Sequence, residues 1–234
     1  MAFKSFTIRD IGTVTVYKHQ RAKSIRLRIH SDNQVRVTIP VWLPYAAGTT
    51  FASSKAEWIR NKLPKPVYFT HDAVIGKQHR IAINYDNKLN APKVTLRDEL
   101  ISVTLPFGQQ LQESGLQAKI QTTAEKALRR EAKDYLPRRL SELATSHNFT
   151  YGDVRIKKMT SRWGSCSSRS DISLSIYLMQ LDDELIDYVL LHELLHTIIP
   201  AHGKKFWDEL AVHVPNLSSL RKQMRSHEPR IIPR

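Results

Sequence analysis

The stretch Tyr188-Val-Leu-Leu-His-Glu-Leu-Leu-His-Thr-Ile-Ile199 is apolar almost all round, which is typical of a buried helix. His192 and His196 are four residues apart, so their side chains share one face of that helix and can bind one metal ion. Glu193 lies close to the same ion without having to bind it. Burying these three side chains without partners would cost several kcal/mol, and a bound metal removes that cost. The alternative is a buried helix whose histidines are only hydrogen-bonded.

A third ligand has to come from beyond this helix. Pro200 disfavours helical geometry at Ile199 and bends the chain, so the segment after it can return toward the ion. We therefore predict His202 as the third ligand, with Gly203 giving the chain latitude just after it. A loop histidine in solvent is the competing interpretation. Four other residues are alternative ligands: Asp208, Glu209, His213 and His227.

Three imidazoles beside a carboxylate are typical of a metal-dependent hydrolase. The histidines hold one Zn²⁺ per chain, an open position keeps a water, and Glu193 acts as general base. This chemistry predicts a peptidase with protein or peptide substrates. The alternative is a metal-dependent phosphohydrolase acting on nucleotides, like a nucleoside triphosphate pyrophosphatase. A non-catalytic module with a structural zinc is a third possibility, but such a site has no need of a base.

Three segments together resemble a known family. They are Arg162-Trp-Gly-Ser-Cys-Ser167, the run from Leu185 to His196, and Pro200-Ala-His-Gly-Lys-Lys-Phe-Trp207. This set is similar to the YgjP-like metal-dependent hydrolases, which are related to the SprT-like zincin proteases. The basic stretch from Arg21 to Arg28 resembles the family more loosely. The resemblance implies His192, His196 and His202 as zinc ligands and Glu193 as general base.

Other residues of these segments have expected roles beside the metal. In related zincins an edge strand pairs with the extended substrate, and Gly164 would let a substrate backbone come close. Arg162 is a candidate for contacting substrate or stabilising charge. We expect Trp163 to pack in the core, and Phe206 and Trp207 to support the His202 turn. The lone Cys166 is expected to be a small buried residue rather than a ligand.

Composition places the chain among globular proteins. Of its 234 residues, 41% are hydrophobic and 25% are charged. With one cysteine it forms no internal disulfide, and its start does not resemble a signal peptide. The longest apolar stretch is too short and too polar to cross a bilayer. These features predict a cytoplasmic protein with no membrane association.

The net charge of +14 is concentrated in the first half, because residues 1–115 carry +9 and residues 116–234 carry +5. An excess of this size favours polyanions, so nucleic acid or nucleotides are possible partners of the basic surface. Arg26, Arg28 and Arg36 lie on the outer face of two predicted strands. A solvated strand face is the commoner meaning of that pattern, and no aromatic residue alternates with these arginines along the sequence.

The pattern of apolar residues changes near residue 112. Residues 1–112 form a β-rich module with strands near 13–18, 25–29, 35–39, 79–85, 92–97 and 100–105 and a helix near 46–62. Residues 113–234 begin with a long helix, in which Pro137 predicts a kink or a split and Arg139 faces outward. A small sheet, the metal helix and a helix near 204–213 follow. We therefore predict an α+β protein whose second domain is a minimal zincin-like core.

Overall fold

The computed structural model describes residues 2–9, 11–30, 34–63 and 68–233. Helices and small sheets occur throughout, so the predicted α+β class is confirmed. The chain forms two compact units, Met1–Val67 and Tyr68–Arg234. The expected division near residue 112 differs from this one, since a second sheet formed by residues 74–105 belongs to the same unit as the long helix.

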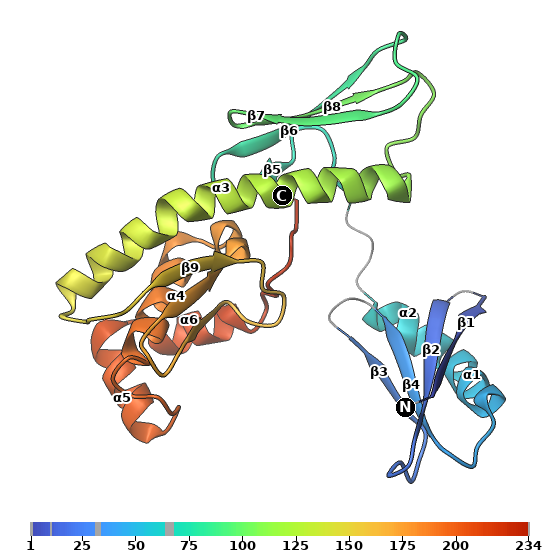
Figure 1. The fold of residues 1–234 in the computed structure, drawn as a ribbon, viewed down its shortest axis with the longest axis horizontal. Helices are drawn as coiled ribbons and strands as arrows, with labels where there is room; N and C mark the ends of the chain where they lie inside the picture. Colours follow the sequence, from blue (N-terminus) through green and yellow to red (C-terminus); the bar gives the residue numbers. More distant parts are fainter. Residues whose placement is uncertain (1, 10, 31–33, 64–67, 234) are drawn as a thin grey trace. The chain divides into compact units, whose positions relative to one another are not determined.

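The first unit is a four-stranded sheet with helices on one face (Figure 1). Its strands lie in the order β1-β2-β4-β3, with β2 and β4 parallel and the outer pairs antiparallel. The helix-covered face is built from buried Val14, Val16, Val37 and Ile39. The elements are β1 (Phe3–Ile8), β2 (Gly12–His19), β3 (Arg26–Ile29), β4 (Val35–Pro40), α1 (Tyr45–Ser54) and α2 (Ala56–Lys62).

Close packing holds α1 on this sheet. A Cβ added at Gly48 would lie 2.6 Å from Cγ1 of Val16 and 3.3 Å from Cγ2 of Ile39. Only glycine therefore lets the helix approach the sheet so closely. The single helix expected near 46–62 is two helices, which meet at Lys55.

The second unit begins with a sheet of the same topology. Its order is β5-β6-β8-β7, again with a parallel central pair and antiparallel outer pairs. Val35-Arg-Val-Thr-Ile-Pro40 and Ile101-Ser-Val-Thr-Leu-Pro106 occupy the same place in the two sheets. The fold thus repeats one strand arrangement. The strands are β5 (Val74–Ile75), β6 (His79–Tyr85), β7 (Lys93–Arg97) and β8 (Leu100–Leu105).

A long helix, α3 (Ser114–Ser146), links this sheet to the rest of the second unit (Figure 1). Its 33 residues span about 50 Å. The helix continues through Pro137, so the predicted split does not occur. Its buried stripe packs in one core with the β5–β8 sheet and with the C-terminal elements. The helix is therefore the common support of both.

A buried carboxylate fastens the second sheet to this helix. Glu131 accepts hydrogen bonds from the backbone N–H groups of Lys77, Gln78 and His79 at 2.8, 3.0 and 3.3 Å. It also contacts Nδ1 of His79 at 2.5 Å. A Cβ at Gly76, where φ is +66°, would collide with the same carboxylate. The turn between β5 and β6 is thus shaped around Glu131.

The C-terminal part of the second unit carries the predicted metal helix. A three-stranded sheet in the order β10-β11-β9 precedes it, and two helices follow. None of the described helices combines the length and the apolarity needed to cross a membrane. The elements are β9 (Val154–Lys157), β10 (Gly164–Cys166), β11 (Ile172–Ser175), the 3-10 helix η1 (Ile176–Gln180), α4 (Asp183–Leu195), α5 (Lys204–His213) and α6 (Leu217–Met224).

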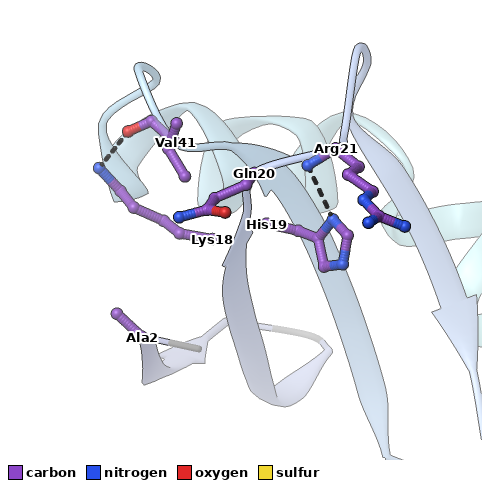
Figure 2. Close-up of a pocket in the computed structure, with 6 residues that line it drawn as sticks. All are labelled: Ala2, Lys18, His19, Gln20, Arg21 and Val41. Carbon is purple, nitrogen blue, oxygen red and sulfur yellow. Dashed lines mark hydrogen bonds between the residues drawn. The ribbon is translucent and has the colours of Figure 1, made fainter.

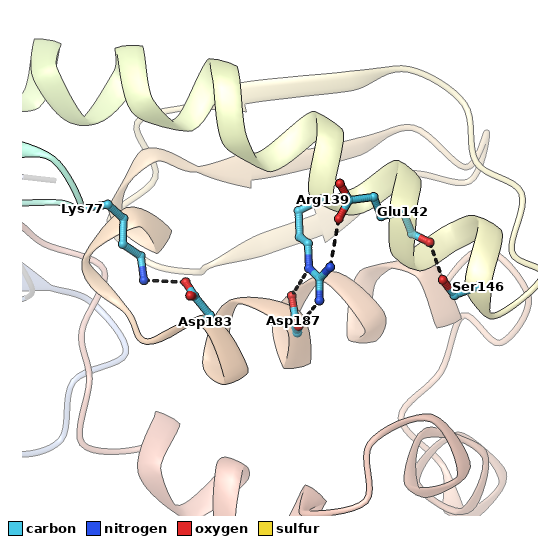
Figure 3. A network of polar contacts seen from close by, with 6 residues as sticks. All are labelled: Lys77, Arg139, Glu142, Ser146, Asp183 and Asp187. Carbon is cyan, nitrogen blue, oxygen red and sulfur yellow. Dashed lines mark hydrogen bonds and ion pairs between the residues drawn. The ribbon is translucent and has the colours of Figure 1, made fainter.

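Ion pairs join α4 to its neighbours (Figure 3). Arg139 of α3 donates from Nε and Nη2 to the two carboxylate oxygens of Asp187 at 2.8 and 2.7 Å. Nη1 of the same guanidinium donates to Glu142 at 2.9 Å. Lys77 Nζ donates to Asp183 at 2.6 Å. Arg139 was predicted to face outward; instead it fixes α4 against α3.

Candidate metal centre

The helix α4 is stabilised by packing, because most of its side chains are buried. Nine of its thirteen residues belong to the buried set, and Asp183 and Glu184 lie in its first turn, where negative charge is favourable. The helix ends at Leu195. The N–H of Ile199 donates to the carbonyl of Leu195 at 2.9 Å, and the chain then turns at Pro200. This early end gives the following segment room to fold back.

Three imidazoles meet at the end of α4. Nε2 of His192 lies 3.2 Å from Nε2 of His196 and 2.9 Å from Nε2 of His202, and the last two are 3.0 Å apart. In a tetrahedral site with zinc–nitrogen bonds of 2.0–2.1 Å, ligand nitrogens are about 3.3 Å apart. Among the described residues, these three histidines are the group that can hold a metal ion. The structure therefore brings the three predicted ligands together.

Aromatic side chains hold two of the rings in place. The fully buried ring of Phe206 stacks on His196 with centroids 4.6 Å apart. Trp207 stacks on His202 at 5.5 Å, and its Nε1 donates to the His202 carbonyl at 3.1 Å. Nδ1 of His196 donates to the carbonyl of Ile199 at 3.1 Å, which leaves Nε2 as the acceptor nitrogen. The expected packing of Phe206 and Trp207 against this turn is present.

The environment of the rings suits a metal. Burial, with the nearby His196, His202 and Arg221, lowers the pKa of His192 to about 3, and burial also lowers the pKa of His196. Metal ligation needs neutral imidazole, and both shifts favour that form. The buried Nδ1 of His192 has no hydrogen-bond partner among the described residues. The donor set thus fits a divalent cation at the three Nε2 atoms.

Glu193 is buried beside the triad, with 6% of its surface exposed. Burial raises the pKa of Glu193 to about 7, while the positive charge of Arg162 acts in the opposite direction. No described residue donates a hydrogen bond to its carboxylate. A carboxyl group with this pKa can both accept and return a proton near neutral pH.

A hollow of about 930 Å³ opens over the histidines and Glu193, lined also by residues 161–168 around β10. Arg162 is exposed in this wall, and Trp163 is partly buried and packs against the core. A Cβ at Gly164 would lie 2.6 Å from Cγ and Oε1 of Glu193. Gly164 was expected to admit substrate; in the structure its missing side chain makes room for Glu193.

The alternative ligands have other partners. Nδ1 of His213 lies 2.9 Å from Nδ1 of His147, and Glu209 lies 3.7 Å from the other ring nitrogen of His213. Asp208 pairs with Lys204 at 2.7 Å, and Nδ1 of His227 contacts the Gln223 carbonyl at 2.9 Å. Burial and the neighbouring Glu193 and Asp171 raise the pKa of the Cys166 thiol, so this cysteine is not an activated nucleophile.

The sequence did not predict one neighbour of the site, Arg221. The guanidinium of Arg221, from α6, lies 3.7 Å above the ring of Trp207. A cation over an indole face is a favourable pair. The contact joins α6 to the His202 turn, and it depends on how helices fold together rather than on any local motif.

Comparison with known proteins identifies the family of the chain. Residues 23–227 match the model of the family described as YgjP-like, metallopeptidase domain. No curated protein matches the chain. The crystal structure of the metallopeptidase zymogen of Methanocaldococcus jannaschii jannalysin is similar, with 27% sequence identity and a TM-score of 0.35, over 38% of this chain and 93% of that one. Because the family model spans most of the sequence, the chain belongs to the YgjP-like family, whose description is that of a metal-dependent peptidase.

Proposed function

We propose that the protein is a zinc-dependent peptidase in which His192, His196 and His202 hold one zinc ion and Glu193 is the general base. One observation carries this proposal. The three Nε2 atoms lie within 3.2 Å of one another, beside the buried carboxylate of Glu193, which belongs to the same helix, α4, as His192. The order of long helix, small sheet and metal helix supports a zincin-like core. An all-histidine set favours zinc over calcium or magnesium.

Each residue of the site has a separate role in the proposed reaction. Zinc bound there would supply Lewis acidity toward a water molecule and the scissile carbonyl. Glu193 takes the proton of the attacking water and gives it to the nitrogen of the leaving amine. Its raised pKa suits both transfers, because neither protonation state is strongly favoured near pH 7. Arg162, exposed at the rim, is placed to stabilise negative charge on the substrate.

Substrate is proposed to bind as an added strand on β10. This strand is at the edge of its sheet, and within the described part of the chain it pairs with β11 alone. Ser165 pairs with Ser173, and Trp163 and Ser167 on either side bond toward the partner strand. In an antiparallel pair the alternate residues, Gly164 and Cys166, then direct their N–H and C=O groups to the free edge. An extended peptide pairing there would run past the histidines.

Replacement of the base tests the mechanism. We expect Glu193→Gln to keep one zinc per chain by elemental analysis and to cleave an unstructured protein such as casein about 10² to 10⁴ times more slowly. The substitution removes the proton acceptor and changes little else. Unchanged turnover in this variant would refute the assigned base. A different result would favour a phosphohydrolase: the wild-type protein releases phosphate from nucleoside triphosphates but does not cleave casein, and Glu193→Gln abolishes the phosphate release.

A further inference from the structure

The first unit carries most of the charge of the chain. Residues 1–67 contain twelve Lys and Arg against three Asp and Glu, a net charge of +9, although they are less than a third of the sequence. The described part of this unit contains one acidic residue, Glu57, and it lies on α2. The face of the sheet opposite the helices therefore carries no described carboxylate.

Aromatic and basic side chains meet on that open face. The strand register places Phe3, Tyr17, Thr38 and Arg26 in one row across the sheet, and Ser5, Thr15, Arg36 and Arg28 in the next row. The rings of Phe3 and Tyr17 lie 5.3 Å apart, and 59% of Phe3 is exposed. The Arg36 guanidinium lies 5.7 Å from the Tyr17 ring centre. We call these eight residues the open-face platform.

A hollow lies at the end of β2 (Figure 2). His19 follows Tyr17 by two residues and so lies on the same face. The hollow, of about 600 Å³, is lined by Lys18, His19 and Arg21 together with Ala2, Gln20 and Val41. The N–H of Arg21 donates to Nδ1 of His19 at 3.2 Å. Lys18 Nζ donates to the carbonyl of Val41 at 3.0 Å and lies 5.1 Å from the ring of Tyr45, on the helix-covered side. Arg21 and His19, with no acidic residue among the described lining residues, leave this end of the strand favourable to an anion such as phosphate.

The second sheet shows that the fold itself does not require these residues. Its strand order and directions are the same, and its register gives the equivalent open-face positions. At the position equivalent to Tyr17 the second sheet has Asn84, and at the position equivalent to Arg36 it has Ser102. Thr95 is equivalent to Arg28, and Ala82 to Thr15. Of the positions compared, only Lys93, equivalent to Arg26, is charged. Arg80 and Arg97 also lie on this face of the second sheet, so its basic charge is not unusual, but no aromatic residue stands at the position of Tyr17. A sheet of this kind is thus stable without that ring, and the pairing of aromatic and basic side chains on the platform calls for another explanation.

We propose that the open-face platform binds single-stranded nucleic acid. Exposed aromatic rings stack with unpaired bases, and arginines beside them bind the phosphates. A four-stranded sheet with helices on one face offers an open surface on the other, along which nucleotides can lie. A duplex keeps its bases stacked inside and leaves nothing for Phe3 and Tyr17 to stack on. Among the described residues of this unit, none places a carboxylate on this face to repel a phosphate backbone.

Fluorescence anisotropy of the full chain with labelled 15-nucleotide single strands tests the proposal. We expect Tyr17→Ala to weaken binding at least about 5-fold by loss of stacking, and Tyr17→Phe to bind like wild type. The pair Arg26→Thr and Arg28→Thr should lower the slope of log Kd against log salt by about 1.4, about 0.7 for each phosphate contact. Thermal unfolding of each variant shows whether the fold is kept.

The second sheet supplies the matched control. Lys93→Thr with Arg97→Thr removes the same charge from exposed strand positions of the sister sheet, and we expect it to leave binding unchanged. Equal loss in this control, unaltered binding by Tyr17→Ala, or equally tight binding of a duplex would overturn the proposal. So would binding to vesicles containing phosphatidylserine without binding to oligonucleotides, which would assign the face to a membrane.

Discussion

At the scale of single residues, the approach of Gly164 to Glu193 decides where the proposed base lies. A methyl group at position 164 would stand 2.6 Å from Cγ and Oε1 of the Glu193 side chain, so that side chain would have to shift. We predict that Gly164→Ala displaces the carboxylate and lowers kcat at least about tenfold while zinc content stays the same. Casein cleavage and elemental analysis measure the two effects.

Gly115→Ala is the control for that substitution, since a Cβ at position 115 meets nothing within 4 Å. It should have wild-type activity. If Gly164→Ala were equally active, the close contact would have no bearing on the base.

The protonation of His192 predicts how acid affects the metal-free protein. Burial first, and the neighbouring charges second, lower the pKa of His192 to about 3 from an ordinary 6.5. The unfolded chain therefore takes up this proton at a higher pH than the folded chain, and folding stability falls as pH decreases from about 6.5 toward 3. The loss reaches at most about 1.4 kcal/mol per pH unit from this group.

Urea unfolding of chelator-treated protein at pH 7, 6 and 5 measures that loss. His192→Asn removes the titrating ring and should make the free energy of unfolding less dependent on pH in this range. An equally steep dependence in the variant would show that other groups are responsible.

Residue patterns in the sequence predicted that the three histidines meet and that Phe206 and Trp207 support the His202 turn, but they did not predict the other contacts of the site. His192, Glu193 and His196 follow from helical spacing alone, and Pro200 made the return of His202 predictable. Gly164 and Glu193 are 29 residues apart, and Phe3 and Tyr17 become neighbours only through the register of β1 and β2. Sequence spacing does not reveal that pair, because strand pairing puts the two rings side by side.

At the scale of elements, α4 is held in place by polar contacts as well as by its apolar sides. The bidentate hydrogen bond from Arg139 to Asp187 raises the pKa of the guanidinium and joins α3 to α4 (Figure 3). We predict that Arg139→Ala lowers the free energy of unfolding by about 1–3 kcal/mol, since Asp187 loses a charged partner while partly buried. Urea denaturation measures the change.

Arg138→Ala is the matched control on the same helix. Arg138 is exposed and adjacent in sequence, so its removal should change the free energy of unfolding by less than about 0.5 kcal/mol. Similar losses in the two variants would mean that the bond to Asp187 contributes nothing of its own.

The boundaries of elements were predicted less well than their existence. Strands β6 and β8 begin and end where expected, because their alternation of apolar and polar residues is regular. Glu131 and Arg139 were beyond prediction, since the partners that bury them lie about 50 residues away. The continuity of α3 through Pro137 was also unexpected: packing on both sides of the helix outweighs the lost hydrogen bond.

At the scale of the whole molecule, the metal should stabilise one unit and not the other. All three histidines belong to the second unit, and binding energy at a site absent from the unfolded chain adds to its stability. We predict that removing zinc with a chelator speeds hydrogen exchange in α4 and α5 and leaves β1–β4 unchanged. Mass spectrometry of peptides from the full chain measures this.

Zinc added back should restore the slow exchange in α4 and α5, and His196→Ala should exchange quickly with or without the metal. Faster exchange in β1–β4 upon chelation would show instead that the first unit depends on the metal as well.

The shared support given by α3 limits how the chain can be shortened. Gln117 is hydrogen-bonded to the backbone of Phe69, and Glu131 is hydrogen-bonded to the turn before β6. The helix α3 therefore depends on contacts with residues that precede it in the sequence. A truncated protein beginning at residue 113 would present Ile120, Ala124 and Leu128 to water and leave Glu131 without its donors. Such a fragment would aggregate, whereas one that begins at Tyr68 retains every one of these contacts. The smallest soluble form of the peptidase therefore includes the strands that precede its long helix.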